Sequence, residues 1–146
     1  MENRITNIFT EGAIPVQMIT DSILRHESKT GVGAHALFLG QIRADPIDNK
    51  PVLAIQYTAN MDLAMLQMEA ISESVSSKYA LDSILVYHSL GSVSVGEICF
   101  FVFVSSERRK AAISACEEVV ERVKKELPIW GKELYADSTY TWKKNY

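Results

Sequence analysis

Basic side chains gather around a short rigid turn near the end of the chain. Residues 124–133 read KKELPIWGKE, so Lys124 and Lys132 stand on either side of a Pro-Ile-Trp core. Paired ammonium groups held by such a turn could bind an anion or exchange protons with one. A lysine late in a helix is also favourable through the helix dipole alone, and Trp130 is more often a core residue than a ligand contact.

Arginines stand at the ends of two further predicted elements. Arg43 closes the apolar run LFLGQIR, and Arg108 with Arg109 opens a long helix in SSERRK. Basic groups at a helix N-terminus oppose the helix dipole, which argues weakly that an anion or a carboxylate lies nearby. A single arginine after a strand is, taken alone, most often a solvated surface residue.

The composition is typical of one compact domain covering residues 1–146. The chain has 47% hydrophobic and 23% charged residues and a formal net charge of -3. Residues 1–104 carry 6 Lys and Arg against 11 Asp and Glu, and residues 105–146 carry 9 against 7. This modest basic excess is far from the strongly basic face of a nucleic-acid binder and suits a small anionic ligand.

Apolar segments, cysteines and histidines predict where the protein is located and whether it binds a metal. The chain shows neither a run of about 20 apolar residues nor a secretory signal pattern, so we expect a cytoplasmic protein with no membrane contact. Cys99 and Cys116 lie in apolar surroundings without metal-ligand spacing, which favours buried reduced thiols. The three histidines are scattered, so we expect neither a metal site nor a cofactor.

The periodicity of apolar residues predicts where the helices and strands lie. Strands are expected at 31–43, 52–59 and 82–91, followed by a turn at Gly96 and a strongly β-prone strand to Ser106. Residues 44–51 hold two prolines with Asp and Asn, so they predict a connection.

Two helices are defined by their apolar faces and their ends. One begins after Asn60, a favourable N-cap, and ends near Tyr79. The other begins after Ser105-Ser106, which could cap it, and ends before Pro128. Its predicted buried face comprises Ala112, Cys116, Val119, Val120, Val123 and Leu127.

The complete order is strand, helix, strand, strand, helix, strand, strand, helix and a tail of short strands. We therefore predict an α+β fold in which helices pack on a largely antiparallel sheet, similar to an α/β hammerhead.

Several of these segments together resemble the large, catalytic subunit of molybdopterin synthase. The resemblance covers about residues 30–143 and includes FLGQIR, YTAN and the final TW. Its most specific parts are H-x-x-G-x-x-x-x-G-E at 88–97, the V-S-S-x-x-R helix start and the K-x-x-x-P-I-W turn.

The resemblance implies an activity and partners. A member of this family transfers sulfur from the C-terminal Gly-Gly thiocarboxylate of a small ubiquitin-like subunit to cyclic pyranopterin monophosphate. Two sulfurs form the dithiolene of molybdopterin, without a metal at this step. The implied assembly is a heterotetramer with a central homodimer of large subunits.

The resemblance also implies which residues form the site. Lys124 matches the essential lysine four positions before the proline, and Lys132 is expected to act as a second catalytic lysine. The residues expected to bind substrate are Gln41, Ile42, Arg43, Arg108, Arg109, Gly131 and Glu133.

Departures from the family pattern leave alternatives open. Gly131 stands where the family has its second lysine, and Lys132 comes one residue late. Ser89 and Arg108 also differ from the family's His-Arg pairs, and Gln56 replaces a common glutamate. Either Lys132 substitutes for the missing lysine, or the chain is a slowed or non-catalytic relative that binds partner or pterin. An RNA-binding domain is a weaker alternative, because RNP and GxxG motifs are missing.

Overall fold

The structure is a computed structural model that describes residues 7–47 and 50–143. Three helices and eight strands follow one another in these residues. They are β1 (Phe9–Glu11), α1 (Val16–His26), β2 (Ala34–Gln41), β3 (Pro46–Ile47), β4 (Lys50–Ala59), α2 (Met61–Tyr79), β5 (Ser83–Ser94), β6 (Ile98–Ser106), α3 (Arg109–Glu126), β7 (Ile129–Tyr135) and β8 (Tyr140–Trp142). The predicted α+β class is confirmed.

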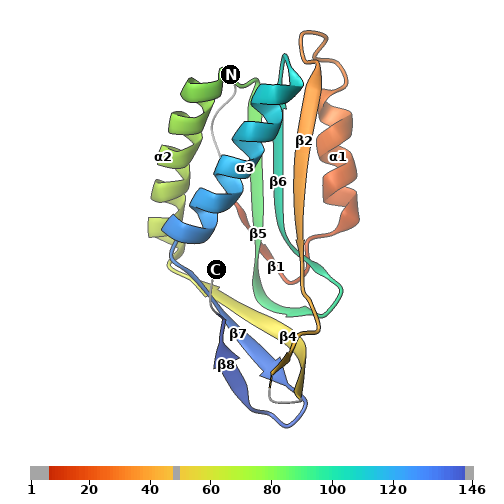
Figure 1. Cartoon of the computed structure of the whole chain (residues 1–146), viewed down its shortest axis with the longest axis vertical. Coiled ribbons are helices and arrows are strands. Elements are labelled where there is room, and N and C mark those ends of the chain that lie inside the picture. The colour runs from red at the N-terminus through yellow and green to blue at the C-terminus, as the bar shows by residue number, and fades with distance from the viewer. Residues whose placement is uncertain (1–6, 48–49, 144–146) are drawn as a thin grey trace.

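The strands form one sheet in the order β2-β6-β5-β4-β7-β8, with β1 beside β5 and β3 beside β4. All ladders are antiparallel except the short β1–β5 pair. Figure 1 shows the long strands β2, β6 and β5 in the upper part, and β4, β7 and β8 extending below the helices. The largely antiparallel sheet is therefore also confirmed.

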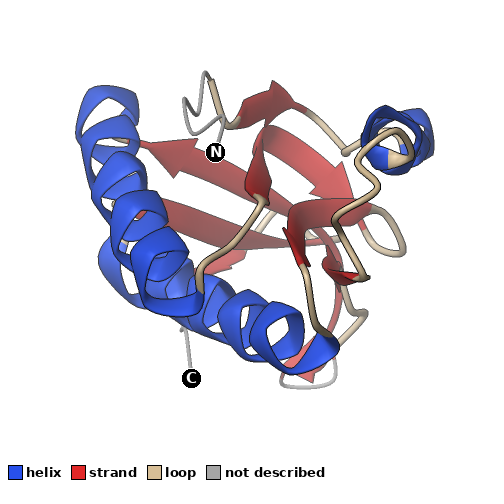
Figure 2. Ribbon diagram, turned by 90° about the horizontal axis from the view of Figure 1, so that it is seen from above, coloured by secondary structure: helices blue, strands red, loops and turns tan. Residues whose placement is uncertain are grey.

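Helices cover both faces of the upper sheet. Figures 1 and 2 show α2 and α3 together on one side and α1 on the other. The alternation of β6 side chains explains this arrangement: Phe101 and Phe103 pack with Ile19 of α1, whereas Val102 and Val104 belong to the core under α2 and α3. Every residue of β6 from Cys99 to Ser106 is buried as a result.

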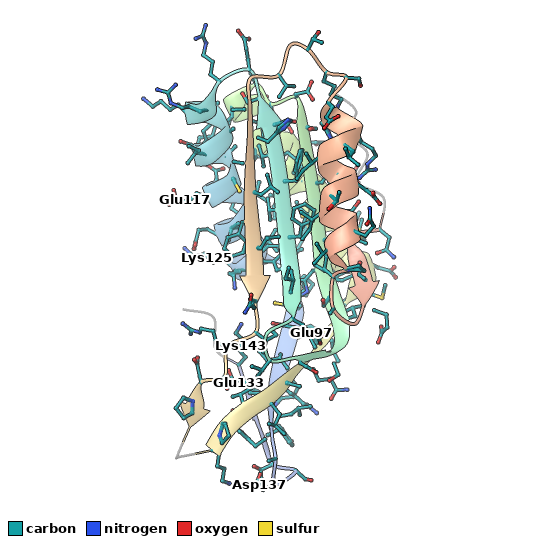
Figure 3. All side chains as sticks on the ribbon, turned by 90° about the vertical axis from the view of Figure 1, so that its right-hand side faces the viewer. Glu97, Glu117, Lys125, Glu133, Asp137 and Lys143 are labelled. Carbon is teal, nitrogen blue, oxygen red and sulfur yellow. The ribbon has the colours of Figure 1, made fainter. Side chains whose placement is uncertain are left out.

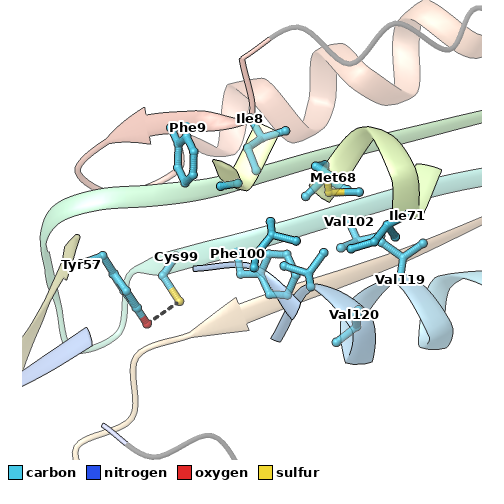
Figure 4. Packing of buried hydrophobic residues seen from close by; sticks show 14 of the residues in the cluster. Ile8, Phe9, Tyr57, Met68, Ile71, Cys99, Phe100, Val102, Val119 and Val120 are labelled. Carbon is cyan, nitrogen blue, oxygen red and sulfur yellow. Dashed lines mark hydrogen bonds between the residues drawn. The ribbon is translucent and has the colours of Figure 1, made fainter. Parts of the chain in front are cut away.

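The main core lies between the sheet and the helix pair α2–α3. Figure 4 shows Met68 and Ile71 of α2 beside Val119 and Val120 of α3, over Val102 of the sheet. All six residues of the predicted α3 face are buried: Ala112, Cys116, Val119, Val120, Val123 and Leu127. This packing holds the last turn of α3, and hence its lysines, against the sheet.

The helix ends agree with the sequence in three cases, including the end of α2 at Tyr79, and differ in one. The Asn60 side chain accepts a hydrogen bond from the backbone N–H of Leu63 at 3.2 Å, so the predicted N-cap is confirmed. Helix α3 ends at Glu126, before Pro128. The predicted cap at Ser105-Ser106 is wrong, because both serines pair with β2 in the ladder of β6. Arg108 takes the N-cap position without a side-chain cap.

Strand β5 runs beyond Gly91, where the sequence predicted its end. The strand pairs with β6 as far as His88 and with β4 from Gly91 onward. Gly91 has a φ of 76°, a backbone conformation that suits glycine and lets the strand bend from one partner to the next. The predicted turn at Gly96 is confirmed, with a φ of 89°.

The bounds of the other strands differ from the predicted ones by a few residues. Strand β2 is shorter than the predicted 31–43, and the predicted connection 44–51 contains β3 and the start of β4. Residues 48 and 49 of that connection lie outside the described part of the chain. Helix α1, whose bounds the pattern did not define, buries Ile19, Ser22 and His26 on one face.

Candidate anion-binding site

A pocket of about 370 Å³ lies where the end of α3 meets strands β4, β7 and β8. The described side chains that line it include three lysines and no carboxylate. The polar ones are Gln41, Tyr57, His88, Cys99, Lys124, Lys125 and Lys143. Figure 3 shows Lys125 above and Lys143 at the junction between the helical layer and the lower strands.

Lys124 is half-buried on the last turns of α3, beside the buried Val123. Its ammonium group lies 5.9 Å from the centre of the Phe100 ring. Burial lowers the pKa of Lys124 from its ordinary value, and the positive charge of Lys143 lowers it further. Lys124 therefore gives up its proton more readily than a solvated lysine does.

His88 forms the floor of the pocket and is neutral near pH 7. Its Nδ1 donates to the carbonyl oxygen of Ser89 at 2.8 Å, which leaves Nε2 as an acceptor. Burial lowers the pKa of His88 to about 4, and the charges of Lys124 and Lys143 act in the same direction. The ring packs edge-on against Tyr57, 4.9 Å between centroids.

Tyr57 and Cys99 connect the pocket to the end of β2. The Tyr57 hydroxyl donates to Cys99 Sγ at 3.6 Å, as Figure 4 shows, and the Cys99 thiol donates to the Gly40 carbonyl at 3.5 Å. Burial raises the pKa of Tyr57 well above its ordinary value, and Cys99 and Glu133 add to this. Tyr57 therefore stays protonated near pH 7, as a hydrogen-bond donor in the pocket wall.

Three of the predicted site residues line this pocket together: Lys124, Gln41 and Gly131. Glu133 does not line it but lies on the same face of β7 as Gly131. It pairs with Ile55, two residues before Tyr57 on β4, and its charge contributes to the raised pKa of Tyr57.

Other predicted residues lie outside the pocket. Ile42 is 2% exposed, and its backbone bonds to Glu97 and Gly96. Arg43 extends into solvent and pairs with Asp45 at 3.0 Å. The Lys132 ammonium group lies over two aromatic rings of β8, 4.7 Å from the centre of Tyr140 and 4.9 Å from that of Trp142.

Arg108 and Arg109 lie at the far end of α3 from the pocket. Fifteen residues separate Arg109 from Lys124 on that helix, a distance of about 22 Å at 1.5 Å per residue. They border a separate hollow with Gly33 and Lys110. Within one chain, the two arginines therefore do not meet the lysines.

The sequence analysis did not assign Lys143, Lys125, Tyr57 or Cys99 to the site. Lys125 follows Lys124 directly and could have been found by position. Lys143 and Tyr57 are distant in sequence and reach the pocket only through strand pairing, so no local pattern marked them. Cys99 and Cys116 are both buried free thiols, as predicted.

Two further observations concern the described residues as a whole. No three His, Cys, Asp or Glu side chains within ranges 7–47 and 50–143 are grouped so that they could hold a metal ion. Within the same residues, none of the helices combines the length and apolar character that crossing a bilayer requires. What the pocket offers is positive charge, protonated donors and a lysine that releases its proton readily.

Fold and pocket together define an α+β protein with a cationic, lysine-lined site. The family model described as "MoaE protein" matches residues 10–126, and the chain belongs to the MoaE family. Two of its curated relatives carry the name molybdopterin synthase catalytic subunit. The protein from Aspergillus niger is 36% identical over 85% of this chain and 68% of its own length. The protein from Rattus norvegicus is 34% identical over 77% of this chain and 56% of its own length.

Solved structures share the fold. A molybdopterin synthase structure from Staphylococcus aureus matches with a TM-score of 0.84 and 23% identity, covering 97% of this chain and 100% of that one. A complex of subunits 1 and 2 of the molybdopterin-converting factor from Helicobacter pylori matches with a TM-score of 0.79 and 21% identity, over 94% and 89% of the two chains. The present chain spans about half to two thirds of the two curated relatives described above.

Proposed function

We propose that this chain is a molybdopterin synthase catalytic subunit that works in molybdenum cofactor biosynthesis. It transfers sulfur from the C-terminal thiocarboxylate of a small ubiquitin-like subunit to cyclic pyranopterin monophosphate. The observation that carries this proposal is the half-buried Lys124 in a pocket that also holds Lys125 and Lys143, without a carboxylate among its described lining residues. Family membership and the names of the relatives support it.

The electrostatic requirement of the reaction matches this pocket. A thiocarboxylate and a phosphorylated pterin are both anions, so they repel each other at the distance where sulfur must pass. Fixed cations around them offset that repulsion and stabilise the charge that develops during transfer. In each transfer a C–S bond to the pterin forms as a C–O bond of the pterin breaks, and water then cleaves the bond between the acyl carbon and sulfur, so the small subunit leaves as a carboxylate. Two transfers complete the dithiolene.

We assign Lys124 two tasks in this scheme. As an ammonium group it holds an anionic oxygen or sulfur, and its lowered pKa lets it exchange a proton with the reacting atoms. The Tyr57 hydroxyl and the neutral His88 line the same space and can donate and accept hydrogen bonds without adding negative charge.

The small subunit is the proposed partner, and the related Helicobacter pylori complex of subunits 1 and 2 supports this choice. A Gly-Gly tail has no side chains, so it can enter a narrow pocket in extended form. We place one small subunit on each of two large subunits that form a central dimer.

The outer edge of β2 supports the dimer, because it has no partner among the described strands. It exposes 39% of Leu37 and 44% of Leu39. A second copy is also what could bring Arg108 and Arg109 to the Lys124 pocket. We also place the protein in the cytoplasm, where its two free thiols stay reduced.

The decisive experiment is reconstitution. The purified chain is incubated with the thiocarboxylated small subunit and cyclic pyranopterin monophosphate, and molybdopterin is measured. We expect product from the wild type and a loss of about 10²-fold or more for Lys124→Ala. Lys78→Ala is the matched control, because Lys78 lies on α2 and pairs with Glu118 at 2.7 Å, outside the pocket. Near-normal transfer by Lys124→Ala, with its fold intact by circular dichroism, would overturn the assignment.

The same assay decides the alternative of a non-catalytic relative. That alternative was raised by Gly131, but the pocket has a second half-buried lysine, Lys143, beside Lys124. A wild-type chain that binds the small subunit and the precursor but forms no molybdopterin would establish the non-catalytic alternative.

A further inference from the structure

Lys132 and Lys143 lie on opposite faces of the β7–β8 ladder. Lys132 pairs with Trp142, and the backbone N–H of Lys143 donates to the carbonyl oxygen of Gly131 at 2.8 Å. In an antiparallel ladder, directly opposed residues share a face and successive residues alternate. Lys143 therefore shares the face of Gly131, whereas Lys132 shares the face of Trp142.

Side-chain contacts agree with this register. The Lys132 ammonium group lies within 5 Å of the ring centres of Tyr140 and Trp142, which are two residues apart and hence on one face. Lys143 instead lines the pocket that Lys124 lines. For the Lys132 side chain to enter the pocket, it would have to lie on the other face of β7. That requires a shift of the strand register by one residue.

Residue 131 has no side chain on the pocket face of β7, and the side chains of Ile55 and Tyr57 occupy the space beside it. A Cβ atom at Gly131 would lie 2.9 Å from Ile55 Cγ2 and 3.1 Å from Tyr57 Cε1. The position is therefore already filled by the packing of β4 against β7. An amine can reach this side of the pocket from the neighbouring strand, and Lys143 stands directly opposite on it.

The charge of Lys143 acts on two titratable groups of the pocket, Lys124 and His88. It contributes to the lowered pKa of Lys124 and to that of His88. No ion pair joins Lys143 to a carboxylate within the described residues. Two ammonium groups that line one pocket repel each other, and an anion bound between them offsets that repulsion.

We propose that Lys143, which directly follows β8, is the second anion-binding lysine of the pocket and binds the phosphate of the pterin precursor together with Lys124. This inference rests on the proposed function and names a residue for it. It also assigns to Lys143 the part that the sequence analysis expected of Lys132.

The first test measures binding of cyclic pyranopterin monophosphate by isothermal titration calorimetry. Lys143→Gln should weaken binding about tenfold, the scale of one lost charged hydrogen bond, and Lys143→Arg should retain most of it. Lys132→Gln is the matched control, because it removes the same charge from the other face of the same hairpin, and it should change affinity less than about twofold.

Binding of the small subunit is measured in parallel, to show whether Lys143 binds the phosphate of the precursor or the thiocarboxylate of the small subunit. We expect its affinity to be unchanged by Lys143→Gln. A loss of small-subunit binding with precursor binding intact would overturn the phosphate assignment. So would wild-type precursor binding by Lys143→Gln, or an equal loss in Lys132→Gln.

A second readout does not depend on sulfur transfer. The Lys124 amine is titrated by NMR with ¹³C-labelled lysine, and its pKa should rise in Lys143→Gln but not in Lys132→Gln. If the wild type forms no molybdopterin, the proposed function fails while this titration still tests the location of Lys143. An unchanged Lys124 pKa in Lys143→Gln would refute the pairing of the two lysines.

Discussion

Gly131 lies directly opposite Tyr57 in the β4–β7 ladder, and a methyl group at residue 131 would come within 3.1 Å of the Tyr57 ring. The backbone at Gly131 does not have positive φ, so the obstacle to a side chain there is packing rather than backbone strain. Ile55, 4% exposed, closes the same space from the other side.

We therefore expect Gly131→Ala to lower the free energy of unfolding by about 1–3 kcal/mol, the usual cost of overpacking a core. Urea unfolding at pH 7.5 measures it. Gly31→Ala is the control, because nothing lies within 4 Å of a Cβ there and its φ is not positive. Equal unfolding midpoints for the two variants would show that Ile55 and Tyr57 accommodate the methyl group.

Stability should fall between pH 6.5 and pH 4 because of His88. Its pKa is about 4 in the folded chain and near 6.5 when unfolded. The unfolded chain therefore binds a proton first as the pH falls, which favours unfolding. The contribution of neutral His88 to the free energy of unfolding is fully present above about pH 6.5, and about 3 kcal/mol of it is lost by pH 4.

Unfolding midpoints at pH 7.5, 6 and 5 test this in the wild type and in His88→Gln, which keeps a donor for the Ser89 carbonyl. The variant should lose less stability over the range. Some slope should remain, because burial also lowers the pKa of His35. Parallel declines in both proteins would exclude His88 as the main source.

Two buried serines should respond oppositely to removal of the hydroxyl. Ser89 Oγ has no hydrogen-bond partner within the described residues, whereas Ser83 Oγ contacts His26 Nε2 at 3.0 Å and also Ser105 Oγ. Ser89→Ala should be neutral or stabilise by up to about 1 kcal/mol, and Ser83→Ala should destabilise by about 1–3 kcal/mol. Thermal unfolding of both variants measures the difference, and a destabilised Ser89→Ala would mean that its hydroxyl is hydrogen-bonded in solution.

Ala80 ends α2 in the left-handed conformation, with a φ of 52°. This conformation is costly for alanine and easy for glycine, which is the usual residue there. Ala80→Gly should therefore raise the free energy of unfolding by about 0.5–1 kcal/mol. Gly96→Ala makes the opposite substitution at another residue with positive φ, since φ at Gly96 is 89°. It should therefore lower the free energy of unfolding. A destabilised Ala80→Gly would contradict the assignment of backbone strain to this cap.

The sequence by itself determined the parts of this protein that depend on local rules. The N-cap at Asn60, the buried face of α3 and its end before Pro128 follow from hydrogen bonding, period and sterics within a few residues. Local rules also placed Lys124 at the end of that helix, just before the turn, whereas its expected role as an essential lysine came from the family resemblance.

Only the tertiary structure decided which other residues join Lys124. Strand pairing over long distances sets the register of β7 between β4 and β8, and a shift of one residue exchanges the two faces. That register turns Lys132 toward Tyr140 and Trp142 and brings Lys143 to the pocket. Helix α3 likewise separates Arg109 from Lys124, since the two residues lie near opposite ends of one helix.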